Sequence, residues 1–512
     1  WIVNGLTVLN NKGKPVKQYE PAFSELGFGC EPPLANGVTP LIHYDALGRV
    51  VRTDMPDGTF SRVEFSPWDV ATWDQNDTVL ESDWYAARAS IDPEVRLPVG
   101  LNGLVTVDAE ARAAWLAIRH ASTPARTILD SLGREVIAIA HNRVEDSAGS
   151  YTIGGRQWKD EFYPTFTKLD AEGKPLWICD ARDNLVMQYI NPPCANAASD
   201  EMPDKAVPCY DIAGNLLFQH SMDAGDRWMI NDATGKPLFA WDFNEWQEGT
   251  TFSDQRRLYR TEYDELHRPT RQWLRIWSRS TGSKDAFIAE SNEVVERMEY
   301  QDAQADDLNN LNGQLVRHYD SSGLLETIRR DYAGNVEEVR RTLVADMKAS
   351  RVDWSSVTNA DGSPKLEPET YIQITEHDAL GRMTTLYNWH RVGCPVAVYT
   401  PKYNRRGALQ SESLRLHAVK TAEGHVPDSG ELTQAIEEIR YDAKGQKQYL
   451  ALGNGTVTRY DYDPKTFRLR QIFTSRPRPD SDFPGYRAQL KDSTVFQQLL
   501  YTYDPVGNIP EV

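Results

Sequence analysis

One short phrase recurs along this chain and constrains its fold more than any other feature of the sequence. In its first clear copy, "HYDALGRVVR" at residues 43–52, an aromatic residue and an aspartate are followed by two variable positions, a glycine and an arginine. Tyrosine suits the end of a strand, aspartate can accept hydrogen bonds from its own backbone, and glycine can adopt the positive φ of a tight turn. The phrase therefore predicts a reversal between two antiparallel strands.

Repetition gives the phrase its weight, because a single copy is a weak signal. We count about fifteen variants, and copies often lie 21 or 41 residues apart, as from Asp211 to Asp232 and from Asp170 to Asp211. One repeat therefore holds about two strands and two turns, which predicts an array of hairpins. The clearest copies predict structural turns formed by Tyr44, Asp45 and Gly48; Tyr210, Asp211 and Gly214; Tyr319, Asp320 and Gly323; Tyr441, Asp442 and Gly445; and Tyr503, Asp504 and Gly507.

The number of turns bears on the overall fold. About thirty strands, at about 4.8 Å per strand, would form a ribbon roughly 140 Å wide, whereas open sheets rarely exceed about ten strands without curling or closing. A propeller would show one signature per blade at a period of about 40 to 50 residues, whereas copies in this chain also lie 21 residues apart. The sequence therefore predicts an all-β fold: a spiralled antiparallel hairpin sheet that curves around a cavity, with a few short helices in insertions.

The repeats run through all 512 residues without a Ser/Gly-rich linker, so we expect one continuous repeat region over residues 1–512. The strand pattern lapses, and insertions are expected, at residues 192–208, 278–312, 345–368 and 418–432.

Two amphipathic helices are expected, at residues 78–90 and 108–120. In the second, Asp108 is the expected N-cap, and Trp115, Leu116 and Ile118 are the expected apolar anchors.

Charge and cysteine content exclude some classes of protein. A net charge of −18 argues against a nucleic-acid or anionic-membrane partner. No apolar run approaches the roughly 18 residues of a membrane-spanning helix. Five cysteines are too few for a disulfide framework in a chain of this length, although a bond between Cys194 and Cys209 is left open.

The residues suggest no catalytic site, no metal and no cofactor. The repeated aspartates are interpreted as turn caps, because a catalytic pair of carboxylates would need to occur only once. The acidic stretches lack the frame of a calcium loop, and the histidines lack zinc-site spacing. His390 and Cys394 are interpreted as a surface histidine beside a buried cysteine rather than a reactive thiolate pair.

The aromatic residues allow two interpretations. The chain has 14 Trp and 23 Tyr, which could form stacking platforms for sugars or could pack one repeat against the next. We favour packing between repeats.

The recurrent Tyr-Asp-x-x-Gly-Arg or Tyr-Asp-x-x-Gly-Asn phrase, with "GTVTRYDYD" between copies, resembles the YD repeat of rearrangement-hotspot (Rhs) proteins. That family includes the B and C components of bacterial Tc toxin complexes, and its repeat also occurs in teneurins. The stretches at residues 66–85 and 123–136 are most similar to the insecticidal-toxin branch. The resemblance covers essentially the whole chain and implies a hollow shell, or cocoon, that encloses a cytotoxic C-terminal effector.

Both ends depart from the family pattern. The chain opens with "WIVNGL", without a methionine, and stops at "YDPVGNIPEV". The expectation is therefore an excised piece of shell wall, without the docking, self-cleaving and effector parts of its relatives.

Two functions of different classes follow. The first is a structural containment shell with no enzymatic activity, whose partners are an enclosed effector polypeptide and a toxin-translocation component. Such a protein would be made in the bacterial cytoplasm and then secreted or delivered outside. The alternative is an extracellular adhesion or carbohydrate-binding scaffold, for which a groove lined by Trp and Tyr would be the sign.

Overall fold

The computed structural model describes most of the chain: residues 2–4, 6–23, 39–88, 109–153, 156–194, 205–244, 247–248, 251–252, 255–279, 287–304, 307–421, 424–425, 430–477 and 493–510. The chain divides into two compact units, with the second inserted into the first. Unit 1 comprises Trp1–Gly173, Asp180–Arg182 and Ile436–Val512, and unit 2 comprises Lys174–Cys179 and Asp183–Ala435.

Unit 1 is built from antiparallel hairpins in chain order. Its strands are β1 (Ile2–Val3), β2 (Thr7–Leu9), β3 (Pro15–Gln18), β4 (Ala22–Phe23), β5 (Leu41–Tyr44), β6 (Val50–Asp54), β7 (Phe60–Phe65), β8 (Asp69–Trp73), β9 (Ala125–Leu129), β10 (Glu135–Glu145), β11 (Tyr151–Ile153), β12 (Arg156–Leu169), β35 (Lys447–Leu452), β36 (Val457–Tyr462), β37 (Leu469–Pro477) and β38 (Ser493–Leu500). Strands β5 to β10 pair in sequence and β10 pairs β12. Strand β34 (Glu431–Tyr441) crosses the boundary between the units, and its later part pairs β35.

Unit 2 repeats this arrangement over a longer stretch. Its strands are β13 (Pro175–Cys179), β14 (Leu185–Gln188), β15 (Ile190–Asn191), β16 (Val207–Pro208), β17 (Phe218–Ser221), β18 (Gly225–Asn231), β19 (Pro237–Asn244), β20 (Gln247–Glu248), β21 (Thr251–Phe252), β22 (Gln255–Tyr263), β23 (Pro269–Arg279), β24 (Phe287–Tyr300), β25 (Leu315–Asp320), β26 (Gly323–Arg330), β27 (Val336–Val344), β28 (Leu366–His377), β29 (Met383–Arg391), β30 (Val396–Tyr403), β31 (Leu409–Ala418), β32 (Lys420–Thr421) and β33 (Gly424–His425). The all-β antiparallel fold expected from the sequence is confirmed.

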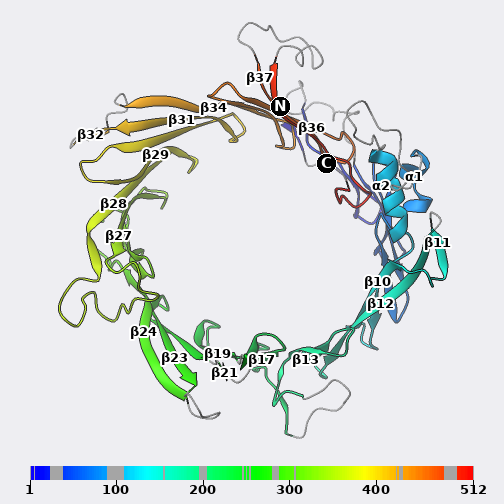
Figure 1. The fold of residues 1–512 in the computed structure, drawn as a ribbon, viewed down its shortest axis with the longest axis horizontal. Coiled ribbons are helices and arrows are strands. Elements are labelled where there is room, and N and C mark those ends of the chain that lie inside the picture. Colours follow the sequence, from blue (N-terminus) through cyan, green and yellow to red (C-terminus); the bar gives the residue numbers. More distant parts are fainter. Residues whose placement is uncertain are drawn as a thin grey trace. The chain divides into compact units, whose positions relative to one another are not determined.

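The strands of unit 2, coloured from green to orange, form one curved layer in Figure 1. The burial of their side chains agrees with a single layer. Along β27 and β28 most positions are half-buried, rather than alternating between a dry face and a wet face. Buried apolar residues accordingly gather in separate small clusters rather than in one centre.

The helices lie in unit 1, beside β10 in Figure 1. Helix α2 (Ala109–Ala117), followed by a 3₁₀ turn at Ile118–His120, confirms the helix predicted at residues 108–120. Trp115 and Ile118 are buried, and Leu116 packs against the same cluster. The predicted N-cap, Asp108, lies outside the described residues.

The single helix predicted at residues 78–90 is wrong. The chain there forms a 3₁₀ turn at Val79–Glu81 and then the one-turn helix α1 (Asp83–Ala86). Ser82 separates them because its backbone is extended, and its hydroxyl accepts a hydrogen bond from the Tyr85 N–H (3.2 Å). The serine therefore caps a new helix instead of continuing the first turn.

The insertion predicted at residues 278–312 is also largely wrong, because β24 occupies much of it as a long strand. Two register shifts in the pairing of β23 with β24 explain the error. Each shift moves the following residues to the opposite face, so the alternation of polar and apolar residues is lost while the strand continues. The insertion expected at residues 345–368 agrees better, since β28 begins only at Leu366.

Candidate functional site

The turn at Asp45 shows how the recurring phrase folds. The Asp45 N–H donates to the Arg49 carbonyl (2.9 Å), and the Gly48 N–H donates to the Asp45 carbonyl (3.0 Å). Gly48 has a φ of +80°, which favours glycine. The Asp45 carboxylate accepts hydrogen bonds from the Arg49 backbone N–H (2.9 Å) and from Arg49 Nε (2.7 Å). The aspartate thus holds both the backbone and the side chain that leave the turn.

The same two backbone hydrogen bonds recur in both units. We call this arrangement the regular turn. Its first residue is Asn10, Asp45, Met55, Asp130, Asp211, Asp232, Asp264, Asp331, Asn359, Asp378, Asn404, Asp442, Leu452 or Asp504. Four of the five turns predicted from the clearest copies therefore have this geometry. In the Asp264 turn, His267 takes the place of the glycine, with a φ of +56°.

Hydrogen bonds within the turns stabilise the ionised aspartates. The backbone N–H of Arg49 and then its side chain lower the pKa of Asp45 from its usual value. The side chain of Asn215 has the largest effect in lowering the pKa of Asp211. The hydroxyl of Thr234, followed by the Lys236 N–H, lowers the pKa of Asp232 to about 2.

Neighbouring turns are joined by a reciprocal pair of hydrogen bonds, which we call the turn-to-turn bridge. At the start of unit 1, Tyr44 Oη donates to the Pro15 carbonyl of the earlier turn (2.6 Å), and Lys14 Nζ of that turn donates to the Gly48 carbonyl (2.6 Å). At the end of unit 1, Tyr503 Oη donates to the Leu469 carbonyl (2.7 Å).

Other bridges use the same positions. In each of them a tyrosine hydroxyl donates to a backbone carbonyl of the preceding turn. This carbonyl belongs to the second residue after the residue with positive φ, which we call the left-handed residue of the turn. The pairs are Tyr210 and Pro175 (2.7 Å), Tyr263 and Pro237 (2.7 Å), Tyr403 and Met383 (2.9 Å), and Tyr462 and Lys447 (2.9 Å).

The second hydrogen bond of the bridge runs from the earlier turn to the later one. Its donor is the side chain of the residue directly after the left-handed residue, and we call this donor the bridging residue. Arg268 Nη1 donates to the Gly313 carbonyl (3.0 Å), and Arg468 Nη1 donates to the Asp504 carbonyl (2.8 Å). The sequence analysis did not assign this role. A signal was present, because lysine, arginine, asparagine or glutamine follows the turn glycine in most copies.

The copy at Tyr319 differs from the predicted turn. Asp320 pairs directly with Gly323 across a two-residue loop, and its carboxylate accepts a hydrogen bond from Arg341 Nη1 (2.9 Å). Tyr319 is only 6% exposed and packs against Trp354, whose ring centroid lies 5.2 Å away. Leu324 follows Gly323, so this turn also lacks a polar bridging residue.

Trp354 comes from the insertion between β27 and β28 and is fully buried. Its Nε1 donates to the Asp320 carbonyl (2.9 Å), and its backbone N–H donates to the Val294 carbonyl (2.7 Å). The Val294 N–H in turn donates to Asp353 Oδ1 (2.9 Å). These hydrogen bonds hold the insertion against β24 and β25.

The last turn, at Asp504, is buried and makes a long-range contact within unit 1. Asn76 Nδ2 donates to Asp504 Oδ2 (2.9 Å), joining residues 428 positions apart. Near it, Asp77 Oδ1 accepts hydrogen bonds from the backbone N–H of Thr123 (3.0 Å) and from its hydroxyl (2.9 Å). Burial raises the pKa of Asp77, in contrast to the exposed turn aspartates.

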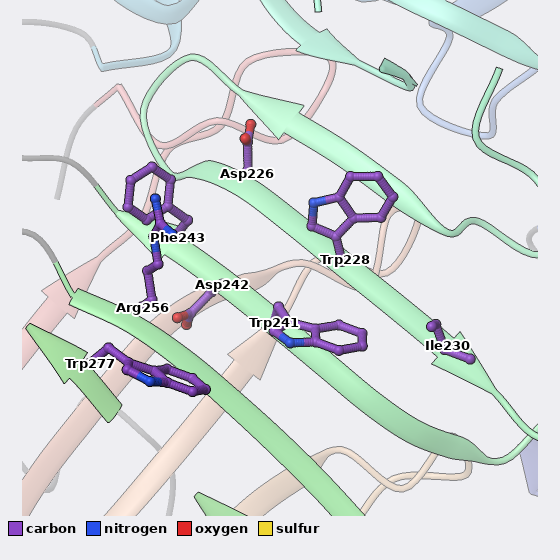
Figure 2. A pocket seen from close by; sticks show the side chains of 8 residues that line it. All are labelled: Asp226, Trp228, Ile230, Trp241, Asp242, Phe243, Arg256 and Trp277. Atoms are coloured by element: carbon purple, nitrogen blue, oxygen red, sulfur yellow. The ribbon is translucent and has the colours of Figure 1, made fainter. Parts of the chain in front are cut away.

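Aromatic residues also line an open pocket on unit 2, with a volume of about 720 Å³. Figure 2 shows its lining, which comes from strands β18, β19, β22 and β23. The residues are Asp226, Trp228, Ile230, Trp241, Asp242, Phe243, Arg256 and Trp277. Packing between repeats therefore does not account for all of the aromatic side chains.

Other candidate sites can be placed as well. No group of three or more His, Cys, Asp or Glu residues that could hold a metal ion occurs in the part of the chain that the structure describes. Cys194 and Cys209 are free thiols, so the disulfide left open for them is not formed.

The interpretation of His390 and Cys394 is reversed. His390 is buried, with Nδ1 2.8 Å from the Asn388 carbonyl oxygen, whereas Cys394 is partly exposed. Among the described residues, no helix has both the length and the apolar character needed to cross a bilayer.

Comparisons with known proteins give consistent results. No protein-family model matches the chain. Toxin subunit YenC2 of Yersinia entomophaga is 29% identical over 309 residues, which cover 58% of this chain and 28% of the subunit. Toxin subunit YenC1 of the same organism is 26% identical over 393 residues, covering 76% of this chain and 34% of the subunit. The chain thus spans about a third of the length of these relatives.

Solved structures share the fold over nearly the whole chain. The crystal structure of TcdB2-TccC3 has a TM-score of 0.68 at 21% identity and covers 99% of this chain and 20% of that one. The Photorhabdus luminescens Tc holotoxin pore has a TM-score of 0.69 at 22% identity, covering 99% of this chain and 19% of that one. The resemblance expected from the repeated turns is confirmed: in sequence this chain is similar to toxin subunits YenC1 and YenC2, and in fold it is similar to the TcdB2-TccC3 and Tc holotoxin structures.

Proposed function

We propose that the chain is a wall segment of a hollow toxin shell that encloses an effector polypeptide and has no catalytic activity of its own. The observation that carries the proposal is the turn-to-turn bridge, which recurs in both units with side-chain donors and backbone carbonyl acceptors. Repeated joints extend a sheet, whereas a catalytic site needs one constellation of side chains. The similarity to Tc toxin subunits supports the same function.

The turn aspartates have a structural role in this proposal, as do the turn tyrosines and glycines, and residues 1–512 act as one continuous repeat region. The half-buried side chains along strands such as β27 suit a wall with solvent or cargo on both faces. The proposed partners are the enclosed effector and a translocation component of the toxin. The protein would be made in the bacterial cytoplasm and delivered outside the cell.

Small-angle X-ray scattering of purified residues 1–512 tests the shell. A compact domain of this length would have a radius of gyration of about 24 Å. We expect a clearly larger value, with a distance distribution weighted toward long distances, as a hollow object gives. A compact value, or the skewed distribution of an extended rod, would reject the containment function.

Expression of residues 1–512 in the bacterial cytosol tests the absence of catalysis. We expect growth at the rate of cells that carry the empty expression vector. Slower growth that depends on the folded chain would reveal an activity that the proposal lacks.

A further inference from the structure

The pocket of Figure 2 is formed by the pairing register of four strands rather than by a loop. Trp228 lies opposite Trp241 across β18 and β19, and Phe243 lies opposite Arg256 across β19 and β22. Arg256 in turn lies opposite Trp277 across β22 and β23. Directly opposed residues point to the same face, so the register brings these aromatic side chains together.

The aromatic rings are held in place and yet remain accessible. The Trp228 ring packs against Phe218, with centroids 4.5 Å apart, and the Trp241 ring stacks on Phe239 at 5.6 Å. Trp228 is nevertheless 37% exposed, and the neighbouring Ile230 is 42% exposed. A fixed, exposed aromatic surface of this kind is typical of a binding site.

Polar groups complete the pocket. Asp226 lies opposite Phe243 across β18 and β19, on the face of the aromatic residues; its side chain is 35% exposed, and its Oδ1 is 2.6 Å from His220 Nδ1. The second oxygen of this carboxylate can accept a hydrogen bond from a ligand. The Arg256 guanidinium, 4.4 Å from the centre of the Phe243 ring, brings N–H donors to the same pocket.

This combination selects among ligand classes. A cation would meet Arg256, and an anion would meet Asp226. A peptide strand would find no free backbone edge, because β19 is already paired with β18 and β22. A neutral ring that carries hydroxyl groups meets none of these obstacles, since its hydroxyls both donate and accept and its C–H face can lie on an indole ring.

We propose that this pocket binds a saccharide. The indole rings of Trp228, Trp241 and Trp277 contact the apolar face of a sugar ring, the Asp226 carboxylate accepts a hydrogen bond from a hydroxyl, and Arg256 donates to another oxygen. The volume of about 720 Å³ lies within the range of small-molecule sites, roughly 300–1,000 Å³. The inference does not depend on the containment function, because all of these residues belong to unit 2 alone.

Titration of the purified 512-residue chain tests the site, with tryptophan fluorescence and saturation-transfer NMR as readouts. The probes are methyl α-D-mannopyranoside, methyl β-D-glucopyranoside, lactose and N,N′-diacetylchitobiose, each up to 20 mM. At least one should bind saturably with a Kd on the order of 1 mM, which is the affinity expected for a shallow site. Absence of saturable binding by all four would overturn the proposal.

Variants locate the binding. Trp228→Ala and Asp226→Asn should each weaken the binding at least tenfold, and Asp226→Asn is nearly isosteric, so it keeps the test valid if the tryptophan variant unfolds. Trp68→Ala is the matched control, because Trp68 is 60% exposed and belongs to unit 1. Binding that survives Asp226→Asn in a folded chain, or binding of choline in place of every sugar, would also overturn the proposal.

Discussion

The turns at Asp442 and Asp320 have the same sequence pattern and different structures. Asp442 begins a regular turn, and its bridging residue Gln446 donates through Nε2 to the Phe467 carbonyl of the next turn (2.9 Å). Asp320 ends a strand, and its tyrosine is buried beneath Trp354. Tyrosine, aspartate and glycine therefore allow two kinds of reversal; Gln446 joins the Asp442 turn to the next one, whereas the Asp320 turn has Leu324 at this position.

The difference also changes what holds each turn in place. The Asp442 turn depends on hydrogen bonds near the surface, which contribute modestly to stability. The Asp320 turn depends on a buried tryptophan and a close backbone contact. Substitutions should therefore have much larger effects around Asp320 than around Asp442.

The largest effect is expected for Trp354→Ala. Trp354 is fully buried, and its removal leaves a cavity and an unpaired Asp320 carbonyl, so the free energy of unfolding should fall by about 3–5 kcal/mol. Tyr332→Ala is a suitable control, because Tyr332 is 84% exposed at the tip of a regular turn and its loss should cost less than about 0.5 kcal/mol. Urea unfolding measures both, and equal losses would contradict the contrast between the two turns.

The next largest difference in unfolding free energy is expected between glycine substitutions in the Asp320 turn and in a regular turn. A Cβ at Gly323 would lie 2.1 Å from the Thr342 carbonyl oxygen, whereas a Cβ at Gly334, in the regular Asp331 turn, would meet open space. Gly323→Ala should therefore lower the free energy of unfolding by about 2–4 kcal/mol. Gly334→Ala should lower it by only about 1–2 kcal/mol, the cost of a left-handed alanine. Thermal melts of both variants would show whether the backbone contact has this effect.

A smaller effect is expected at Asp442 itself. Its Oδ1 accepts a hydrogen bond from the Gln446 N–H (2.8 Å), so Asp442→Ala should cost about 0.5–2 kcal/mol, as the loss of a helix cap does. Asp442→Asn keeps the acceptor and should be nearly neutral, since Asn404 begins a regular turn naturally. If the asparagine variant were as unstable as the alanine variant, the carboxylate charge rather than hydrogen bonding would be responsible.

The smallest effect is expected in the response to pH. The pKa of Asp232 is about 2 in the folded chain and about 3.9 in an unfolded one. Its ionised form therefore contributes stability above pH 4, and this contribution is lost as the pH falls from about 4 to 2. Asp232→Asn should flatten the dependence of the melting temperature on pH in this window. Asp77, whose pKa is raised, should act in the opposite direction.

The sequence predicted the turns because their determinants are local. Asp45 and Gly48 lie within one turn, so their residue types are sufficient to place the reversal. The bridge from Tyr503 to Leu469 spans 34 residues, and the contact of Trp354 with Asp320 also spans 34, so neither follows from a local pattern. The strand pattern of β24 was missed because bulges, which depend on the partner strand, break its alternation.

The sequence indicated the type of the pocket but not the residues that form it. An aromatic groove was considered as the sign of a carbohydrate-binding scaffold, but its members could not be chosen from 14 tryptophans. Trp228 and Trp241 meet because β18 and β19 pair in one register, and a shift by one residue would place them on opposite faces.

The turn-to-turn bridge gives the junctions that contain it a similar chemistry. The later turn supplies a tyrosine hydroxyl, the earlier turn supplies a bridging side chain, and the acceptors are backbone carbonyls that any residue provides. Whole hairpins can then be deleted, duplicated or exchanged between genes, and the new neighbours still match. The length of the array is thereby free to change by recombination without redesign of its joints.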